Sequence, residues 1–202
     1  MDHAMTPPKM TTNEQVNKAV ARYRALLEKH APDWSASVVQ QVLGSPELAG
    51  DQFALFRTRV EAVSNTIVRR VLVNRISTPE QMLDALGRKL YVNRDVVATM
   101  PCGQGSEAEV HFFKPSRFVS DDELEKEYAL RGLVPASPYD VAAVNQADPA
   151  FADSHPNATY WKDVSGKWCY LACGRWVGER SVDVAGRFRD WSAHMWLAGV
   201  RK

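Results

Sequence analysis

The sequence predicts an α+β protein in which an N-terminal helical part precedes a small antiparallel sheet with one or two inserted helices. Up to about residue 90, apolar side chains recur at helical spacing, and proline, glycine and N-cap residues mark the breaks. From Tyr91 onward, short β-branched and aromatic runs alternate with turns. We therefore expect a disordered leader (1–11), a helical domain (12–90) and an α+β domain (91–202) that ends in an antiparallel meander.

The helical part is expected to hold four helices. They cover about 12–30, 35–43, 51–73 and 78–90. Thr12 stands three residues before Gln15, which is the capping-box spacing. The third helix is predicted from apolar residues that form one stripe from Phe53 to Val71. Thr78 followed by Pro79 is a strong start signal for the fourth.

The C-terminal part is expected to alternate strands with two helices. The strands are 91–100, 107–114, 159–163, 167–177, 181–188 and 193–200, and the helices are 121–131 and 139–146. The first two strands are predicted to pair as a hairpin across the Gly-containing turn 101–106. Ser120 caps the helix 121–131, and Gly132 ends it in a left-handed conformation.

Composition excludes several classes of protein. The 202 residues are 45% hydrophobic and 24% charged, which is typical of a globular chain with a sizeable core. The net charge of +1 argues against a strongly basic nucleic-acid coat protein. Three cysteines without a CxxC pair fit a reducing cytoplasm. No apolar run is long enough for a membrane span, and the N-terminus lacks a signal core.

Tryptophan is concentrated near the C-terminus, where five of the six fall in the last 42 residues among several basic side chains. On a strand 167–177, Trp168, Tyr170 and Trp176 share one face. This face predicts a stacking platform for bases or sugars with basic residues at its rim. The predicted ligand-binding residues are Trp168, Tyr170, Trp176, Arg175, Lys167 and Trp196. The alternative is that the two helices cover this face and make the tryptophans core residues.

Other chemistries have weaker signals. The order helix, turn, helix and hairpin over 51–114 matches a winged helix, but Glu80 and Asp84 would face the DNA. Cys102 beside Gly103 is a candidate nucleophile, although it would need a histidine nearby. The scattered histidines show no metal-ligand spacing, and no phosphate-binding or dinucleotide-binding motif is present, so no metal or cofactor is expected.

Four stretches carry a resemblance to other proteins: YALRGLVPASP (128–138), VNQADPAFADSHPN (144–157), WCYLACGRW (168–176) and WLAGVRK (196–202). In these stretches residues 90–202 resemble uncharacterised bacterial proteins of mobile-element-rich genomes. Those proteins have no assigned activity, so the resemblance implies a recurrent module and transfers no functional residue.

These observations predict a cytoplasmic accessory protein of bacterial or phage origin that acts by binding. The expected partner is a nucleic acid or another protein, engaged through the aromatic-basic C-terminal sheet. The helical part is expected to support a homo-oligomer. Two alternatives stay open at this point: a thiol-dependent hydrolase centred on Cys102, and a purely structural or inhibitory protein.

Overall fold

The structure, a computed structural model, describes residues 12–186 and 190–202. The chain forms two compact units, which divide between Leu55 and Phe56. The predicted leader 1–11 and the last two residues of the predicted strand 181–188 lie outside the described residues.

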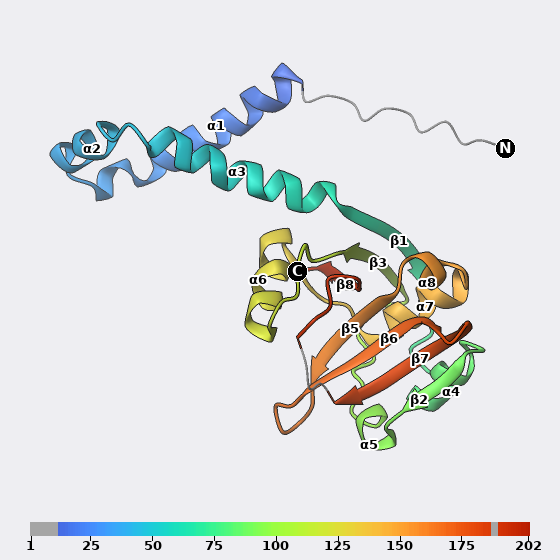
Figure 1. Ribbon diagram of the computed structural model, residues 1–202. Helices are drawn as coiled ribbons and strands as arrows, with labels where there is room; N and C mark the ends of the chain where they lie inside the picture. Colours follow the sequence, from blue (N-terminus) through green and yellow to red (C-terminus); the bar gives the residue numbers. More distant parts are fainter. Residues whose placement is uncertain (1–11, 187–189) are drawn as a thin grey trace. The chain divides into compact units, whose positions relative to one another are not determined.

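The first unit is built from helices in the part of the chain that the structure describes (Figure 1). They are α1 (Asn13–His30), the short 3-10 helix η1 (Ala31–Asp33), α2 (Ala36–Leu43) and the beginning of α3 (Leu48–Ser64). The capping box predicted for α1 is present, with the Thr12 side chain accepting from the backbone N–H of Gln15. Helices α1 and α2 confirm the predicted helices 12–30 and 35–43.

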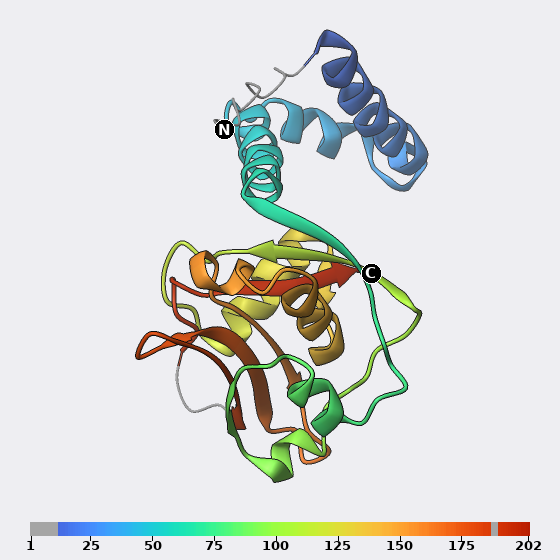
Figure 2. The ribbon, with the colours of Figure 1, turned by 90° about the vertical axis from the view of Figure 1, so that its right-hand side faces the viewer.

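The second unit is organised around an eight-stranded mixed sheet (Figures 1 and 2). Its strands are β1 (Thr66–Leu72), β2 (Lys89–Val92), β3 (Glu107–Phe113), β4 (Leu133–Pro135), β5 (Asn157–Lys162), β6 (Trp168–Trp176), β7 (Glu179–Gly186) and β8 (Trp196–Arg201). The strand order is β1-β3-β8-β5-β6-β7-β2, and β4 also pairs with β8. The pairs β5–β8 and β2–β7 are parallel, and the other pairs are antiparallel.

Helices cover both faces of this sheet. They are α4 (Pro79–Asp84), α5 (Arg94–Val97), α6 (Asp121–Arg131), α7 (Pro138–Ala147) and α8 (Phe151–Ser154). Successive strand residues point to opposite faces, so Phe112 and Phe113 of β3 enter different cores. Phe112 packs in the core that α4, α5, α7 and α8 share, whereas Phe113 packs with Leu124 and Tyr128 of α6.

The α+β class is confirmed, but the sheet is larger than predicted and mixed rather than small and antiparallel. The meander β5-β6-β7 is antiparallel as expected. The final strand departs from the meander because β8 lies between β3 and β5, parallel to β5. A local pattern of alternating residues identifies a strand but does not specify which distant strand becomes its neighbour.

The predicted helix 51–73 is wrong in its second half. Helix α3 ends at Ser64, and β1 begins at Thr66. Ile67 and Val71 fit the helical stripe, but they also belong to a run rich in β-branched residues that pairs with β3. The chain accordingly divides after Leu55 and not near residue 90, since β1 and α4 pack with the sheet.

The predicted hairpin over 91–114 is also wrong. Strand β2 ends at Val92 and pairs in parallel with β7, whereas β3 pairs with β1 and β8. Residues 94–97 form α5, with the Asn93 side chain as its N-cap. The predicted helix 78–90 begins after its Thr78 cap, but it ends at Asp84 because Lys89–Val92 pair with β7 as β2. The predicted helix 121–131 is confirmed: α6 starts after Ser120, and Gly132 ends it with a φ of 68°.

Candidate ligand-binding cleft

The parallel strands β5 and β8 separate towards their carboxyl ends. Strand β5 pairs with β8 at Asn157 and Ala158, while its pairing with β6 continues to Lys162. Beyond Ala158, β4 takes the place beside β8. In open sheets, ligands bind in the crevice at the carboxyl ends of parallel strands that diverge, so this position is a candidate binding site.

A cleft of about 900 Å³ opens at this position. It is lined by Arg75, Pro101, Gly103, Gln104, Glu107, Ala108, Glu109, Glu125, Val134, Pro135, Ala136, Ser137, Asp140, Tyr160, Trp161, Lys162, Val200 and Arg201. Tyr160, Trp161 and Val134 give the walls a largely apolar character. Both the volume and the lining are typical of sites for small ligands, which span roughly 300–1,000 Å³.

Most charged side chains at the rim pair with one another. Lys162 Nζ lies 3.1 Å from Glu125 Oε1, and Arg201 Nε lies 3.8 Å from Glu109 Oε1. Arg70 Nε also donates to Glu109 Oε2 at 2.8 Å. The hydrogen bond from Arg70 keeps the pKa of Glu109 below its ordinary value, so this carboxylate stays charged and is a poor proton donor.

Two polar side chains of the rim stand apart from these pairs. Gln104 and Glu107 are exposed, and neither side chain has a hydrogen-bond or ion-pair partner among the residues that the structure describes. Both side chains therefore have hydrogen-bonding capacity that a ligand could use.

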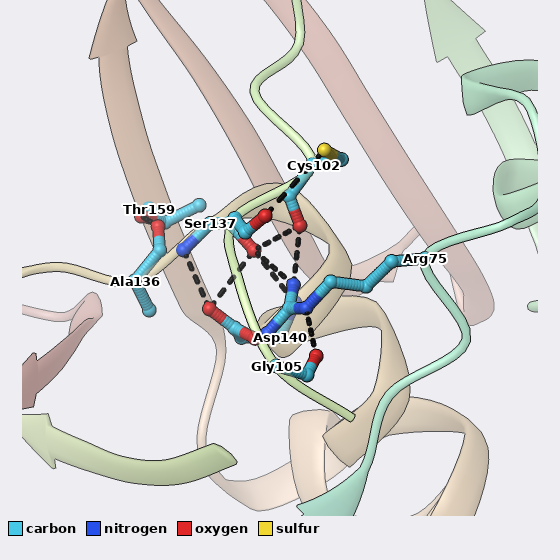
Figure 3. A network of polar contacts seen from close by, with 8 residues as sticks. Arg75, Cys102, Gly105, Ala136, Ser137, Asp140 and Thr159 are labelled. Carbon is cyan, nitrogen blue, oxygen red and sulfur yellow. Dashed lines mark hydrogen bonds and ion pairs between the residues drawn. The ribbon is translucent and has the colours of Figure 1, made fainter. Parts of the chain in front are cut away.

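Arg75 forms part of one wall and is held by a polar network (Figure 3). Its guanidinium donates to Asp140 Oδ1 at 2.6 Å, to Ser137 Oγ at 3.2 Å, and to the carbonyls of Cys102 and Gly105. Asp140 Oδ2 accepts from the backbone N and the Oγ of Ser137 at 2.8 and 2.9 Å. Because the Asp140 side chain is only 5% exposed, this network fastens the loop 101–106 to the start of α7 instead of offering a free charge.

Gly103 lies where the loop passes closest to this network. A Cβ atom at this position would lie 2.7 Å from Arg75 Nη1 and 2.9 Å from Ser137 Oγ. The residue also has a φ of +75°, which other residues rarely adopt. Glycine is therefore required for the loop to close against Arg75.

The structure places Cys102 on this loop, with its thiol turned away from the Arg75 network (Figure 3). The sequence offers His111, His155 and His194 as bases. His111 Nε2 lies 3.0 Å from Glu109 Oε1, and His155 Nδ1 lies 2.8 Å from Ser154 Oγ. Among the described residues, no histidine is hydrogen-bonded to Cys102, so the Cys–His pair that a thiol hydrolase requires is not assembled in this conformation.

The aromatic face predicted on β6 is only partly open. Trp168 and Tyr170 are half-buried and pack with Tyr160 and Trp191 in the core beneath α6. Lys162 Nζ lies 4.4 Å from the centre of the Trp168 ring, which is a cation–π contact. These side chains contribute to the core more than to a stacking surface.

Trp176 lies on the same face of β6 as Trp168 and Tyr170 but at the open end of the strand, and the other three predicted residues lie elsewhere. Trp176 is 66% exposed at the end of β6. Arg175 lies on the opposite side of the strand, where its Nη1 is 3.7 Å from Asp153 Oδ2. Lys167 is exposed at the turn before β6, and Trp196 packs against the other core. The structure thus keeps Trp168, Tyr170 and Trp176 on one face of β6 but places Arg175, Lys167 and Trp196 outside it.

The cleft combines residues that sequence analysis did not select. Arg75 and Asp140 are 65 positions apart, and no local pattern links them. A signal existed for one part of the network, because Ser137 and Asp140 have the spacing of a capping box and form one at the start of α7.

No family model, no curated protein and no solved structure matches this chain. The resemblance to mobile-element proteins therefore stays a prediction. Within the described ranges, no group of three or more His, Cys, Asp or Glu side chains could hold a metal ion, and no helix has the length and apolar character needed to cross a membrane.

Proposed function

We propose that the sheet unit is a binding module without catalytic chemistry, whose cleft receives a short segment of a protein partner. The segment carries an apolar side chain and, next to it, a lysine or an arginine. The proposal rests on the cleft at the diverging carboxyl ends of β5 and β8.

The apolar walls supply the larger part of the expected affinity. Tyr160, Trp161 and Val134 contribute apolar surface to the lining of the cleft, and an apolar side chain seated against this lining loses contact with water. Such burial stabilises a complex by about 25 cal/mol per Å² of apolar surface. A large aliphatic or aromatic side chain is therefore the best anchor for this site.

The charges favour a cationic neighbour for that anchor. Four carboxylates and three cations line the cleft, and Glu107 is the exposed carboxylate without a partner among the described residues. A lysine or arginine of the partner would complete a charge-assisted hydrogen bond with Glu107. A phosphate-bearing ligand would instead meet this uncompensated negative charge.

Binding is favoured over catalysis by the composition of the cleft. Its described lining contains no histidine and no cysteine. The serine and aspartate that line it, Ser137 and Asp140, bond to each other and to Arg75. An activated nucleophile needs a base within hydrogen-bond reach, and these two groups are already occupied as a helix cap.

The test is a titration of the full chain in which tryptophan fluorescence reports binding. Three blocked peptides that differ in one residue are compared: Leu-Arg, Leu-Gln and Leu-Glu. The proposal predicts that the Leu-Arg peptide binds about tenfold more tightly than the Leu-Glu peptide, a difference of about 1.4 kcal/mol. Glu107→Lys is expected to reverse this order. Asp84→Lys is the matched control, because Asp84 is exposed on α4 and does not line the cleft.

Two results would contradict the proposal. One is the absence of saturable binding by any of the three peptides. The other is an unchanged order of affinities in Glu107→Lys, which would place the charge preference elsewhere on the molecule.

A second candidate function is nucleic-acid binding at the open end of β6, and the exposure of Trp176 favours it. Trp176 and Tyr91 border a notch of about 340 Å³ together with Ser181 and Asp183. Two aromatic side chains suit base stacking, whereas the Asp183 carboxylate repels phosphate. This candidate predicts that a dT oligonucleotide quenches the tryptophan fluorescence. The quenching should disappear in Trp176→Ala and should weaken steeply as the salt concentration rises.

A further inference from the structure

The helical unit does not bury a core of its own. None of the residues 12–55 is buried, although eleven of them are large hydrophobic residues in exposed positions. They are Val16, Val20, Tyr23, Leu26, Leu27, Trp34, Val38, Val42, Leu43, Phe53 and Leu55. Isolated helices of this length are marginal in water, and helices in proteins gain most of their stability from packing an apolar face. We therefore expect these exposed apolar side chains to be covered by another surface.

The apolar residues of α1 follow the pattern of helices that pair with other helices. Val16, Val20, Tyr23 and Leu27 succeed one another at spacings of four, three and four residues. Over this short stretch the alternation matches the spacing of a coiled-coil seam, which keeps one stripe of a helix turned towards a partner helix.

The same unit also offers a groove. Tyr23 and Leu27 of α1 line it together with Trp34 and with Val38 and Val42 of α2, and its volume is about 500 Å³. Phe53 projects elsewhere on the unit and does not line the groove. A surface that carries both a groove and projecting apolar side chains can be complementary to a copy of itself.

The exposed apolar area of the unit is comparable to one side of a protein interface. With a whole side chain counted as about 170 Å², the eleven residues expose on the order of 1,000 Å² per chain. Standard protein interfaces bury about 800 Å² on each partner. One copy of the unit thus supplies the apolar surface for one side of such an interface.

The charges of the unit fit self-association. Residues 12–55 carry four basic side chains, Lys18, Arg22, Arg24 and Lys29, and five acidic ones, Glu14, Glu28, Asp33, Glu47 and Asp51. This near-neutral balance produces little repulsion between two copies and little attraction to a nucleic acid or an anionic membrane. We infer that the helical unit is an oligomerisation element that pairs with the helical unit of a second copy of this chain.

The first test is the mass of the full chain in solution, measured by light scattering and sedimentation over a range of concentrations. The inference predicts twice the chain mass of 22.6 kDa, with dissociation on dilution. A mass of one chain at all concentrations up to about 100 µM would overturn it. That outcome is expected if the helices instead dock on the chain's own sheet unit or await a different partner.

Substitutions on α2 locate the interface. Val38→Asp and Val42→Asp introduce a carboxylate into the groove without a large change in helix propensity. Each is expected to weaken the dimer at least thirtyfold, the size of an interface hot spot (about 2 kcal/mol), as measured by sedimentation equilibrium. Gln41→Asp on the same helix is the matched control, because Gln41 does not line the groove, and it is expected to change the dissociation constant less than threefold.

The inference would be overturned by a dimer that both valine variants leave unchanged, or that Gln41→Asp weakens as much as they do. Far-UV circular dichroism accompanies each sample. A monomeric variant with reduced helix content would still support the inference, because the helices then depend on the partner for their stability. The result is independent of peptide binding by the cleft, since no residue of the helical unit lines the cleft.

Discussion

Arg75 and Asp140 are the residues on which the shape of the cleft most depends. Their pair is largely buried, so removing one partner leaves the other charge without compensation. We predict that Asp140→Ala lowers the free energy of unfolding by about 3 kcal/mol or more in a urea titration. Glu125→Ala breaks the exposed pair with Lys162 and is expected to cost less than about 1 kcal/mol. Equal losses in the two variants would show that the Arg75 network does not hold the loop.

Glu123 provides a residue-scale test of pH dependence. A hydrogen bond from Arg117, together with bonds from Ser120, lowers the pKa of its carboxyl group to about 2. A depressed pKa in the folded state adds stability that is present above the ordinary value of 4.5 and is lost as the pH falls towards 2.

Glu123→Gln is therefore expected to lower stability at pH 7 and to flatten the dependence of stability on pH between 4.5 and 2. Urea midpoints measured over this range check the prediction, and a direct NMR titration of the carboxyl group gives its pKa. A carboxyl group that titrates near 4.5 would contradict the arrangement around Arg117 and Ser120.

At the scale of an element, the C-terminal end of α6 depends on a glycine in the left-handed conformation. Gly132 has a φ of 68° and no atom within 4 Å of the position that a Cβ would occupy. Substitution therefore adds backbone strain without a steric clash. We predict that Gly132→Ala costs about 1–2 kcal/mol in urea unfolding, and that Gly132→Asn costs less because asparagine tolerates this conformation. Equal costs for both variants would show that the cap is not the cause.

Elements with local signals were predictable from the sequence, whereas those fixed by distant partners were not. The caps at Thr12 and Ser120 sit within one turn of the helices they start, so their sequence spacing sufficed. The helical stripe that ends at Val71 was ambiguous, because pairing with β3 overrides the helical tendency of β1. The parallel pairing of β2 with β7 joins segments about 90 residues apart, and the local sequence of neither segment indicates its partner.

At the scale of the whole molecule, the candidate site is a product of topology. The cleft combines a residue that follows β1, the loop before β3, the start of α7 and the ends of β5 and β8. The sequence analysis selected Trp168, Tyr170 and Trp176 on one strand together with Trp196 on another. The structure packs Trp168 and Tyr170 against one core and Trp196 against the other, and it leaves Trp176 exposed. Long-range strand order decides which of these residues meet, and single-sequence patterns do not contain it.

The central claim is that the cleft between the ends of β5 and β8 is the binding site, and filling the cleft tests it most directly. In Val134→Trp, a larger side chain occupies the space of the proposed apolar anchor. In the control Val164→Trp, the same side chain is added at a fully exposed turn outside the cleft. The measurement is the dissociation constant of the Leu-Arg peptide for both variants, with urea midpoints to confirm that each is folded. We predict at least a tenfold loss of affinity in Val134→Trp and no change in Val164→Trp. Unchanged affinity in a folded Val134→Trp variant would contradict the claim.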